Sequence, residues 1–254
     1  MVRIIMHGCN GVMGQVITKM AKDMDGLTIV AGIDLKNDKE NGYPVYPSLE
    51  ECKEEADVVV DFASPKAADH LMDFCAEKKL GLVLCTTGLS EAQIKKVKET
   101  AEKTAVLRSA NMSLGVNLLL KLVQEAAKVL ASSGFDIEIV EKHHNQKKDA
   151  PSGTALALAE SMNEALGNQY HYVYDRSSVH EKRDPKEIGI ASVRGGSIVG
   201  DHDVIFAGTD EVITFSHTAY SRAIFGKGAI QAAKYLAGKP AGFYHMSDVI
   251  NAQV

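Results

Sequence analysis

The sequence lacks a paired-cysteine motif, a long apolar run and an excess of positive charge. Its four cysteines form no Cys-x-x-Cys pair, so neither a zinc site nor a disulfide framework is indicated, and we expect a reducing compartment. No apolar run is long enough to span a bilayer. The formal net charge of −5 disfavours a general nucleic-acid binder.

The rest of the composition is that of an ordinary globular protein. Hydrophobic residues make up 45% of the chain and charged residues 24%, a balance that disfavours both disorder and a membrane protein. The 254 residues suffice for one large domain or two modest ones. The first apolar run is short and meets Gly8, so it gives no secretion signal. We therefore expect a cytoplasmic protein with no membrane or nucleic-acid partner.

The first half of the chain alternates strand-like and helix-like patterns. Short apolar runs predict strands at 2–6, 27–33, 58–62, 81–85 and 105–107. Helical spacing or capping residues predict helices at 12–22, 48–55, 65–78 and 90–103, and a loop is expected at 37–47. Repeated βα units of this length predict an α/β fold with a doubly wound parallel sheet of the Rossmann type.

The second half has a different pattern. Helices are predicted at 114–132 and 154–166, and strands at 135–141, 188–194, 200–207 and 211–218. Short turns between successive strands favour a mixed or antiparallel sheet in an α+β domain. A further helix at 223–236 and the segment 243–250 would return to the first domain. We therefore expect a dinucleotide-binding domain at 1–113, completed by 222–254, and a second domain at 114–221.

Three glycines follow the first predicted strand, in the segment Gly8-Cys9-Asn10-Gly11-Val12-Met13-Gly14. Glycine there lets the backbone turn tightly and approach a pyrophosphate, and the helix start that follows offers N–H groups to the phosphates. The spacing is Gly-x-x-Gly-x-x-Gly rather than the commoner Gly-x-Gly-x-x-Gly, so a simple tight turn is the alternative.

Asp34 ends the second predicted strand, about 20 residues after the last glycine, where an acidic side chain can accept hydrogen bonds from the adenosine ribose. Its charge would repel a 2′-phosphate and favours NADH, while Lys36 could offset that repulsion and permit NADPH. A solvated turn residue is the alternative for Asp34. The loops 85–88 and 109–113 follow later strands at the edge where such sheets bind ligands.

The segment 141–154 concentrates two histidines and three lysines ahead of a predicted helix. Histidine suits proton transfer near neutral pH, Lys147 can be a fixed charge or an acid, and the helix start can bind a carboxylate. The pattern indicates an anionic substrate, with a solvated basic loop as the alternative. His143 and His144 would point to opposite faces of a strand and have no acidic or cysteine partner at helical spacing, so no metal site is expected.

Two other patterns receive little weight. Tyr235 and Lys239 match the Tyr-x-x-x-Lys pair of short-chain dehydrogenases, but Gly238 indicates a helix end between them, so they would not share a helical face. Cys85 could be a nucleophile, but a small buried thiol beside the cofactor is the preferred interpretation.

Together these motifs resemble the 4-hydroxy-tetrahydrodipicolinate reductase family over nearly the whole chain. The resemblance is carried by His-His-x-x-Lys-x-Asp-Ala-Pro-Ser-Gly-Thr at 143–154, by the glycine turn at 8–14, by Thr86-Thr87-Gly88 and by 111–117. It implies reduction of a small cyclic dicarboxylate, 4-hydroxy-tetrahydrodipicolinate, with NADH, NADPH or both and no metal, in lysine and diaminopimelate biosynthesis. It also implies a homotetramer assembled through the sheet of the second domain, which would bind the substrate.

The resemblance further implies residue roles. His143 would donate or accept a proton, and Lys147 would donate one. His144, Gly153 and Thr154 would bind substrate, and Arg222 would lie near the hinge and the active site. The cofactor would be lined by Gly8, Cys9, Asn10, Gly11, Val12, Met13, Asp34, Cys85, Thr86, Thr87, Ser109, Ala110, Asn111 and Met112.

Two departures from the family pattern bear on the cofactor. Cys85 stands where a glycine is usual, and Val12 and Leu35 occupy positions that carry arginine in some relatives preferring NADPH, which supports NADH. Two other interpretations stay open. One is a related two-domain dehydrogenase acting on an amino acid or semialdehyde, and the other is a non-catalytic dinucleotide sensor that binds cofactor without turnover.

Overall fold

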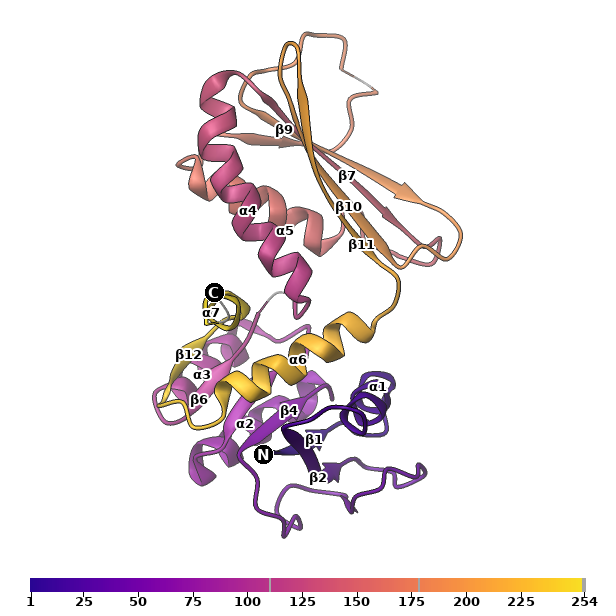
Figure 1. Cartoon of the computed structure of the whole chain (residues 1–254), viewed down its shortest axis with the longest axis vertical. Coiled ribbons are helices and arrows are strands. Elements are labelled where there is room, and N and C mark those ends of the chain that lie inside the picture. The colour runs from indigo at the N-terminus through magenta and orange to yellow at the C-terminus, as the bar shows by residue number, and fades with distance from the viewer. Residues whose placement is uncertain (110, 178, 253–254) are drawn as a thin grey trace. The chain divides into compact units, whose positions relative to one another are not determined.

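The computed structural model describes residues 1–109, 111–177 and 179–252 (Figure 1). The chain divides into two compact units. The first consists of Met1–Ser113 and Ala223–Val254, and the second of Leu114–Arg222. Among the described residues, no helix combines the length and the apolar character needed to cross a membrane.

The first unit contains a seven-stranded sheet in which neighbouring strands run parallel. Its strands are β1 (Val2–His7), β2 (Leu27–Ile33), β3 (Val45–Tyr46), β4 (Val58–Asp61), β5 (Gly81–Leu84), β6 (Ala105–Leu107) and β12 (Gly242–Tyr244). The order β3-β2-β1-β4-β5-β6-β12 reverses direction between β1 and β4. This is the predicted doubly wound sheet, and ligands bind at such a reversal point.

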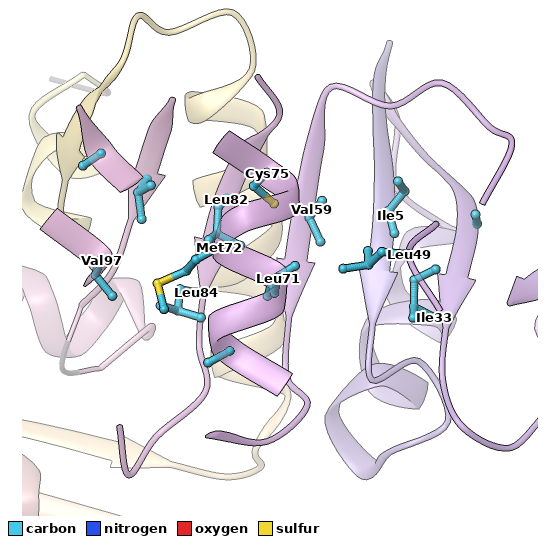
Figure 2. Close-up of a cluster of buried hydrophobic side chains, with 14 residues drawn as sticks. Ile5, Ile33, Leu49, Val59, Leu71, Met72, Cys75, Leu82, Leu84 and Val97 are labelled. Carbon is cyan, nitrogen blue, oxygen red and sulfur yellow. The ribbon is translucent and has the colours of Figure 1, made fainter. Parts of the chain in front are cut away.

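Five helices belong to this unit: α1 (Val12–Ala21), α2 (Pro65–Lys78), α3 (Glu91–Ala101), α6 (Ala223–Leu236) and α7 (Met246–Asn251). α1 packs beside α6, and α2 packs beside α3. On α2, Leu71, Met72 and Cys75 are fully buried, and Figure 2 shows them beside Val59 and Leu82 of the sheet. Their i, i+1 and i+4 spacing places them on one helical face, so burial of that face fixes α2 on the sheet.

The second unit is built on a five-stranded mixed sheet, and the sequence predicts four of its strands in a mixed or antiparallel sheet. Its elements are α4 (Leu114–Leu130), η1 (Ala131–Ser133), β7 (Asp136–His143), α5 (Gly153–Ala165), β8 (His171–Val173), β9 (Glu187–Arg194), β10 (Gly200–Ala207) and β11 (Val212–Ala219). The order is β11-β10-β7-β9-β8, with β10 antiparallel to both neighbours and β9 parallel to both of its own. Val123 of α4 and Leu158 of α5 join Ile139 and Phe206 in one buried core.

The helix predicted at 48–55 does not form. The segment consists of bends and a turn in which the N–H of Cys52 donates to the carbonyl of Leu49 (3.3 Å). Leu49 is buried, and the Tyr46 hydroxyl donates to Glu54 across the segment (3.0 Å). So short a stretch gains too few intrahelical bonds to offset the free energy of helix nucleation. The short strands β3 and β8 were not expected, because two or three residues give no periodicity.

We expect Leu71→Ala to lower the free energy of unfolding by about 2–5 kcal/mol, because it leaves a cavity between α2 and the sheet. Urea denaturation measures this change. Val129→Ala, at a position with 64% of its surface exposed, is the control and should change stability by less than about 0.5 kcal/mol. Equal losses in the two variants would contradict the packing described for α2.

Candidate active site

The glycine turn after β1 leaves no room for side chains at two positions. Gly8 adopts φ +79°, and a Cβ there would lie 2.9 Å from the carbonyl oxygen of Phe62. A Cβ on Gly14 would lie 2.2 Å from the carbonyl oxygen of Gly8. Gly11 caps α1 without a side-chain hydrogen bond, so the cap leaves the first N–H groups of that helix to other acceptors. This is the geometry that phosphate binding by a backbone requires.

Asp34 follows β2 and braces the turn. Its Oδ2 accepts a hydrogen bond from the backbone N–H of Asn10 (2.9 Å). The Asn10 side chain donates to the carbonyl of Lys36 and accepts from the amide of Asn41 (2.8 Å). Asp34 therefore has a structural role in addition to the ribose contact expected from the sequence.

A cavity of about 650 Å³ opens beside this turn, within the first unit. Gly8, Asn10, Gly11, Asp34 and Lys36 are among its lining residues. The other residues predicted for this turn, Cys9, Val12 and Met13, are not among the residues that line the cavity. Cys9 is fully buried and burial raises its thiol pKa to about 11, so only its backbone is available to a ligand. Val12 is 71% exposed at the start of α1, and Met13 is half-buried.

The two later loops have distinct environments. Thr86 follows β5, and its buried Oγ1 has no hydrogen-bond partner among the described residues, which is what a group awaiting a ligand would show. Thr87 next to it is exposed. Burial, reinforced by the charge of Asp61, raises the pKa of the Cys85 thiol, so that thiol stays protonated and is no nucleophile.

In the loop after β6, the N–H of Met246 donates to Ser109 Oγ (2.7 Å) and that of Ser113 donates to Asn111 Oδ1 (2.8 Å). Met112 is buried. Ala110 lies outside the described residues. With the glycine turn, the cavity and the unpaired Thr86 hydroxyl, the first unit fits a nicotinamide dinucleotide.

In the second unit, β7 turns from apolar to charged along its buried face. Ile137 and Ile139 lie in the core, and Glu141 and His143 continue the same alternation. His143 Nδ1 donates to Glu141 Oε2 (2.6 Å), and the N–H of Ser152 donates to Glu141 Oε1 (3.0 Å). Arg194, which pairs with His143 in the β7–β9 register, donates to both oxygens of Glu141 (2.6 and 2.8 Å).

The charges in this cluster are settled by their surroundings. Burial alone would raise the pKa of Glu141, but hydrogen bonds from Arg194 and other donors outweigh it and lower the pKa to about 2. The carboxylate is therefore ionised although its residue is 0% exposed. His202 on β10 is uncharged instead, because burial and the nearby His143 lower its pKa to about 4. His202 is thus neutral at pH 7, with Nε2 2.9 Å from Ser152 Oγ.

The connection from β7 to α5 carries the other predicted residues. Lys147 Nζ lies 2.9 Å from Asp149 Oδ2, and the carbonyl of Asp149 accepts from Arg194 (2.7 Å). The N–H of Lys147 donates to the carbonyl of His144 (3.1 Å), which forms a turn.

α5 then begins at Gly153, which is exposed, with a half-buried Thr154 behind it. Ser152 caps the helix by accepting from the N–H of Ala155 (3.1 Å). All five residues predicted for substrate chemistry therefore lie between the end of β7 and the first turn of α5.

Comparison with known families matches both halves of the chain. The model for the N-terminus of dihydrodipicolinate reductase matches residues 2–112, and the model for its C-terminus matches residues 115–250. The chain belongs to the dihydrodipicolinate reductase family.

Relatives in this family cover the chain almost completely. The 4-hydroxy-tetrahydrodipicolinate reductase of Caldanaerobacter subterraneus subsp. tengcongensis is 55% identical over 98% of each chain. That of Clostridium tetani is 47% identical over 99% of this chain and 98% of its own. A dipicolinate-bound dihydrodipicolinate reductase from Paenisporosarcina sp. TG-14 has a TM-score of 0.81 at 25% identity, covering 96% of this chain and 97% of its own.

Four residues of the second-unit cluster were not assigned from the sequence: Glu141, Ser152, Arg194 and His202. Glu141 carries a detectable signal, because an acidic residue two positions before His143 continues the buried face of the predicted strand. Ser152 has the form of a helix N-cap. Arg194 and His202 give no local signal, since only strand pairing brings them to β7.

The Tyr-x-x-x-Lys pattern does not form a catalytic pair. α6 ends at Leu236, as Gly238 with φ +76° indicates. Tyr235 and Lys239 nevertheless meet, because the Lys239 ammonium lies 4.5 Å from the centre of the Tyr235 ring. Tyr235 lies in the last turn of α6 and Lys239 beyond its end, so this is a cation–π contact and not a pair on one helical face. Among the described residues, no group of three or more His, Cys, Asp and Glu side chains is arranged to hold a metal ion.

We expect His202 to make the second unit acid-sensitive between pH 6.5 and about 4. In this range the unfolded chain binds a proton on His202 that the folded chain does not, so stability falls as the pH falls. The loss can reach about 3 kcal/mol at the acid end. His202→Gln should flatten the dependence of unfolding free energy on pH, measured by urea denaturation, and the exposed His180→Gln should not. An unchanged slope in His202→Gln would contradict this assignment.

Proposed function

We propose that the chain reduces 4-hydroxy-tetrahydrodipicolinate to tetrahydrodipicolinate with a nicotinamide dinucleotide, a step of lysine and diaminopimelate biosynthesis. The observation that carries this proposal is the juxtaposition of His143, ionised Glu141 and the capped start of α5 within the family motif at 143–154. Relatives that share 55% and 47% of its residues bear the name of this activity.

The dinucleotide is proposed to bind the first unit, with NADH preferred and NADPH accepted. When bound, it supplies the hydride. The backbone of the turn that begins at Gly8 is suited to the diphosphate, and Thr86 offers its unpaired hydroxyl. The Asp34 carboxylate and the 90% exposed Leu35 favour a free ribose hydroxyl, while Lys36 on the cavity wall permits a 2′-phosphate.

The second unit is proposed to bind the cyclic dicarboxylate. The related reductase from Paenisporosarcina is described as bound to dipicolinate, a ring that carries two carboxylates. α5 opens at Gly153 and Thr154, where the helix dipole favours a carboxylate, and His144 is placed one turn before Lys147 to contact the same ligand.

Proton transfer is assigned to Lys147 and His143. Loss of the ring hydroxyl as water leaves a conjugated imine, to which one hydride and one proton then add at neighbouring atoms of the conjugated system. The Glu141 carboxylate holds the Nδ1 proton of His143, which leaves Nε2 as the ring nitrogen for proton transfer. The positive charges of Lys147 and the α5 start stabilise negative charge that develops on the ring during reduction.

The assembly is proposed to be a cytoplasmic homotetramer joined through the mixed sheet. In this arrangement the first unit binds the cofactor, and the second binds the substrate and forms the interface. Apolar residues exposed on that sheet support the interface. Val193 on β9 is 46% exposed and Val212 on β11 is 61% exposed.

The direct test is NADH oxidation, followed by absorbance, with enzymatically generated 4-hydroxy-tetrahydrodipicolinate. Turnover supports the proposal. Turnover only with an amino acid or semialdehyde would favour the related dehydrogenase, and cofactor binding without turnover of any of these would favour a sensor.

Lys147→Ala should lower kcat by at least about two orders of magnitude, because it removes the proposed proton donor. NADH affinity, measured by fluorescence titration, should stay near the wild-type value. Lys148→Ala is the matched control, because it removes the same charge from the exposed neighbouring position. A collapse of NADH affinity in Lys147→Ala, with kcat unchanged at saturating NADH, would refute this role.

Asp34→Asn should weaken NADH binding more than NADPH binding. Asparagine retains an oxygen that can accept from the N–H of Asn10, so the glycine turn keeps its brace while the charge facing the ribose is removed. Titration with both nucleotides gives the ratio of dissociation constants, which should move toward NADPH by about tenfold. Equal losses for the two nucleotides would show that Asp34 acts only on the turn.

A further inference from the structure

The buried carboxylate of Glu141 is bonded to three separate parts of the second-unit site. Oε2 accepts from His143 and Oε1 accepts from the N–H of Ser152, the residue that caps α5. Arg194 bonds both oxygens and also the carbonyl of Asp149, whose side chain pairs with Lys147. A single buried ion pair thus touches the proton-transfer histidine, the anion-binding helix start and the partner of the lysine.

We propose that Glu141 and Arg194 are positioning residues for the reaction: the Glu141–Arg194 pair fixes the ring of His143 and the start of α5 in the orientation that protonates and binds the substrate. This inference rests on the proposed function, since it concerns how that site is held. Neither side chain is assigned a contact with substrate or cofactor.

The geometry explains why a carboxylate is needed at position 141. One oxygen must accept from an imidazole N–H while the other accepts from a backbone N–H, and Arg194 must still find an acceptor on each. A carboxylate has four lone-pair sites on two oxygens and no donor, whereas an amide offers one acceptor oxygen and one donor nitrogen. Glutamine could therefore satisfy only some of these partners.

The far side of the His143 ring is equally confined. A Cβ on Gly200 of β10 would lie 3.0 Å from His143 Nε2, so a side chain at position 200 would press against the ring. His202 packs edge-on against it, with ring centres 5.2 Å apart. The charged and titratable groups around the ring are Glu141 on β7, Arg194 on β9, His202 on β10 and, beyond the strand, Lys147 with Asp149.

The test compares Glu141→Gln, His143→Gln and the double variant in the reductase assay across pH, in the full-length protein. Glu141→Gln should lower kcat/KM about 100-fold, because the His143 ring and the N–H of Ser152 lose the two carboxylate oxygens that hold them. In the His143→Gln background the same change should cost less than about threefold in kcat/KM, because residues that act as one unit are not additive.

Two further variants keep the outcome decisive. Asp57→Asn in the first unit removes a carboxylate that also pairs with an arginine, Arg3 (2.8 Å), and should leave kcat/KM within about twofold of wild type. Arg194→Lys keeps the charge but cannot bridge both oxygens, so kcat should fall about tenfold with the pH profile unmoved. This variant decides the matter alone if Glu141→Gln does not fold.

The inference is overturned if Glu141→Gln and Arg194→Lys both behave as Asp57→Asn does. It is also overturned if the losses of Glu141→Gln and His143→Gln multiply in the double variant, which is the mark of independent structural damage. A wild-type protein without turnover would instead refute the proposed function itself, so the two failures are distinguishable. NADH affinity should be unchanged in every second-unit variant.

Discussion

The second unit depends on one buried charge. Glu141 is ionised at a position with no exposed surface, and a carboxylate removed from water is tolerated only where donors surround it. Arg194 and the N–H of Ser152 supply those donors, and they come from β9 and from the cap of α5. The charge therefore links the β7–β9 strand pair to the start of α5, and the neighbouring His143 ring is held by the same carboxylate.

At the glycine turn of the first unit, backbone groups and not charged side chains are available to a ligand. Side chains are excluded at Gly8 and Gly14 by contacts under 3 Å, so peptide N–H groups can approach a diphosphate. Asp34 acts here as a brace, since it fixes the N–H of Asn10. Backbone groups suit a ligand that many proteins share, whereas the imidazole and ammonium groups of the second unit are the groups proposed to act on a dicarboxylate.

The sequence predicts the fold and the family, but it predicts short elements and contacts between side chains less completely. Apolar runs located the long strands of both sheets, because their residues are buried on one or both faces. The pattern failed at 48–55, where no helix forms, and it could not show β3 or β8. For Tyr235 and Lys239 it predicted the helix end correctly but missed their ring contact, which the turn after α6 creates.

Local patterns along the chain determined the longer strands, the glycine turn and the motif from His143 to Thr154, because each is a run of neighbouring residues. Tertiary structure alone decided which distant side chains complete the site. Arg194 lies about 50 positions after His143 and reaches it because β7 and β9 are parallel and in register, while His202 arrives from antiparallel β10. Strand register places these groups within hydrogen-bond range, and no spacing in the sequence encodes it.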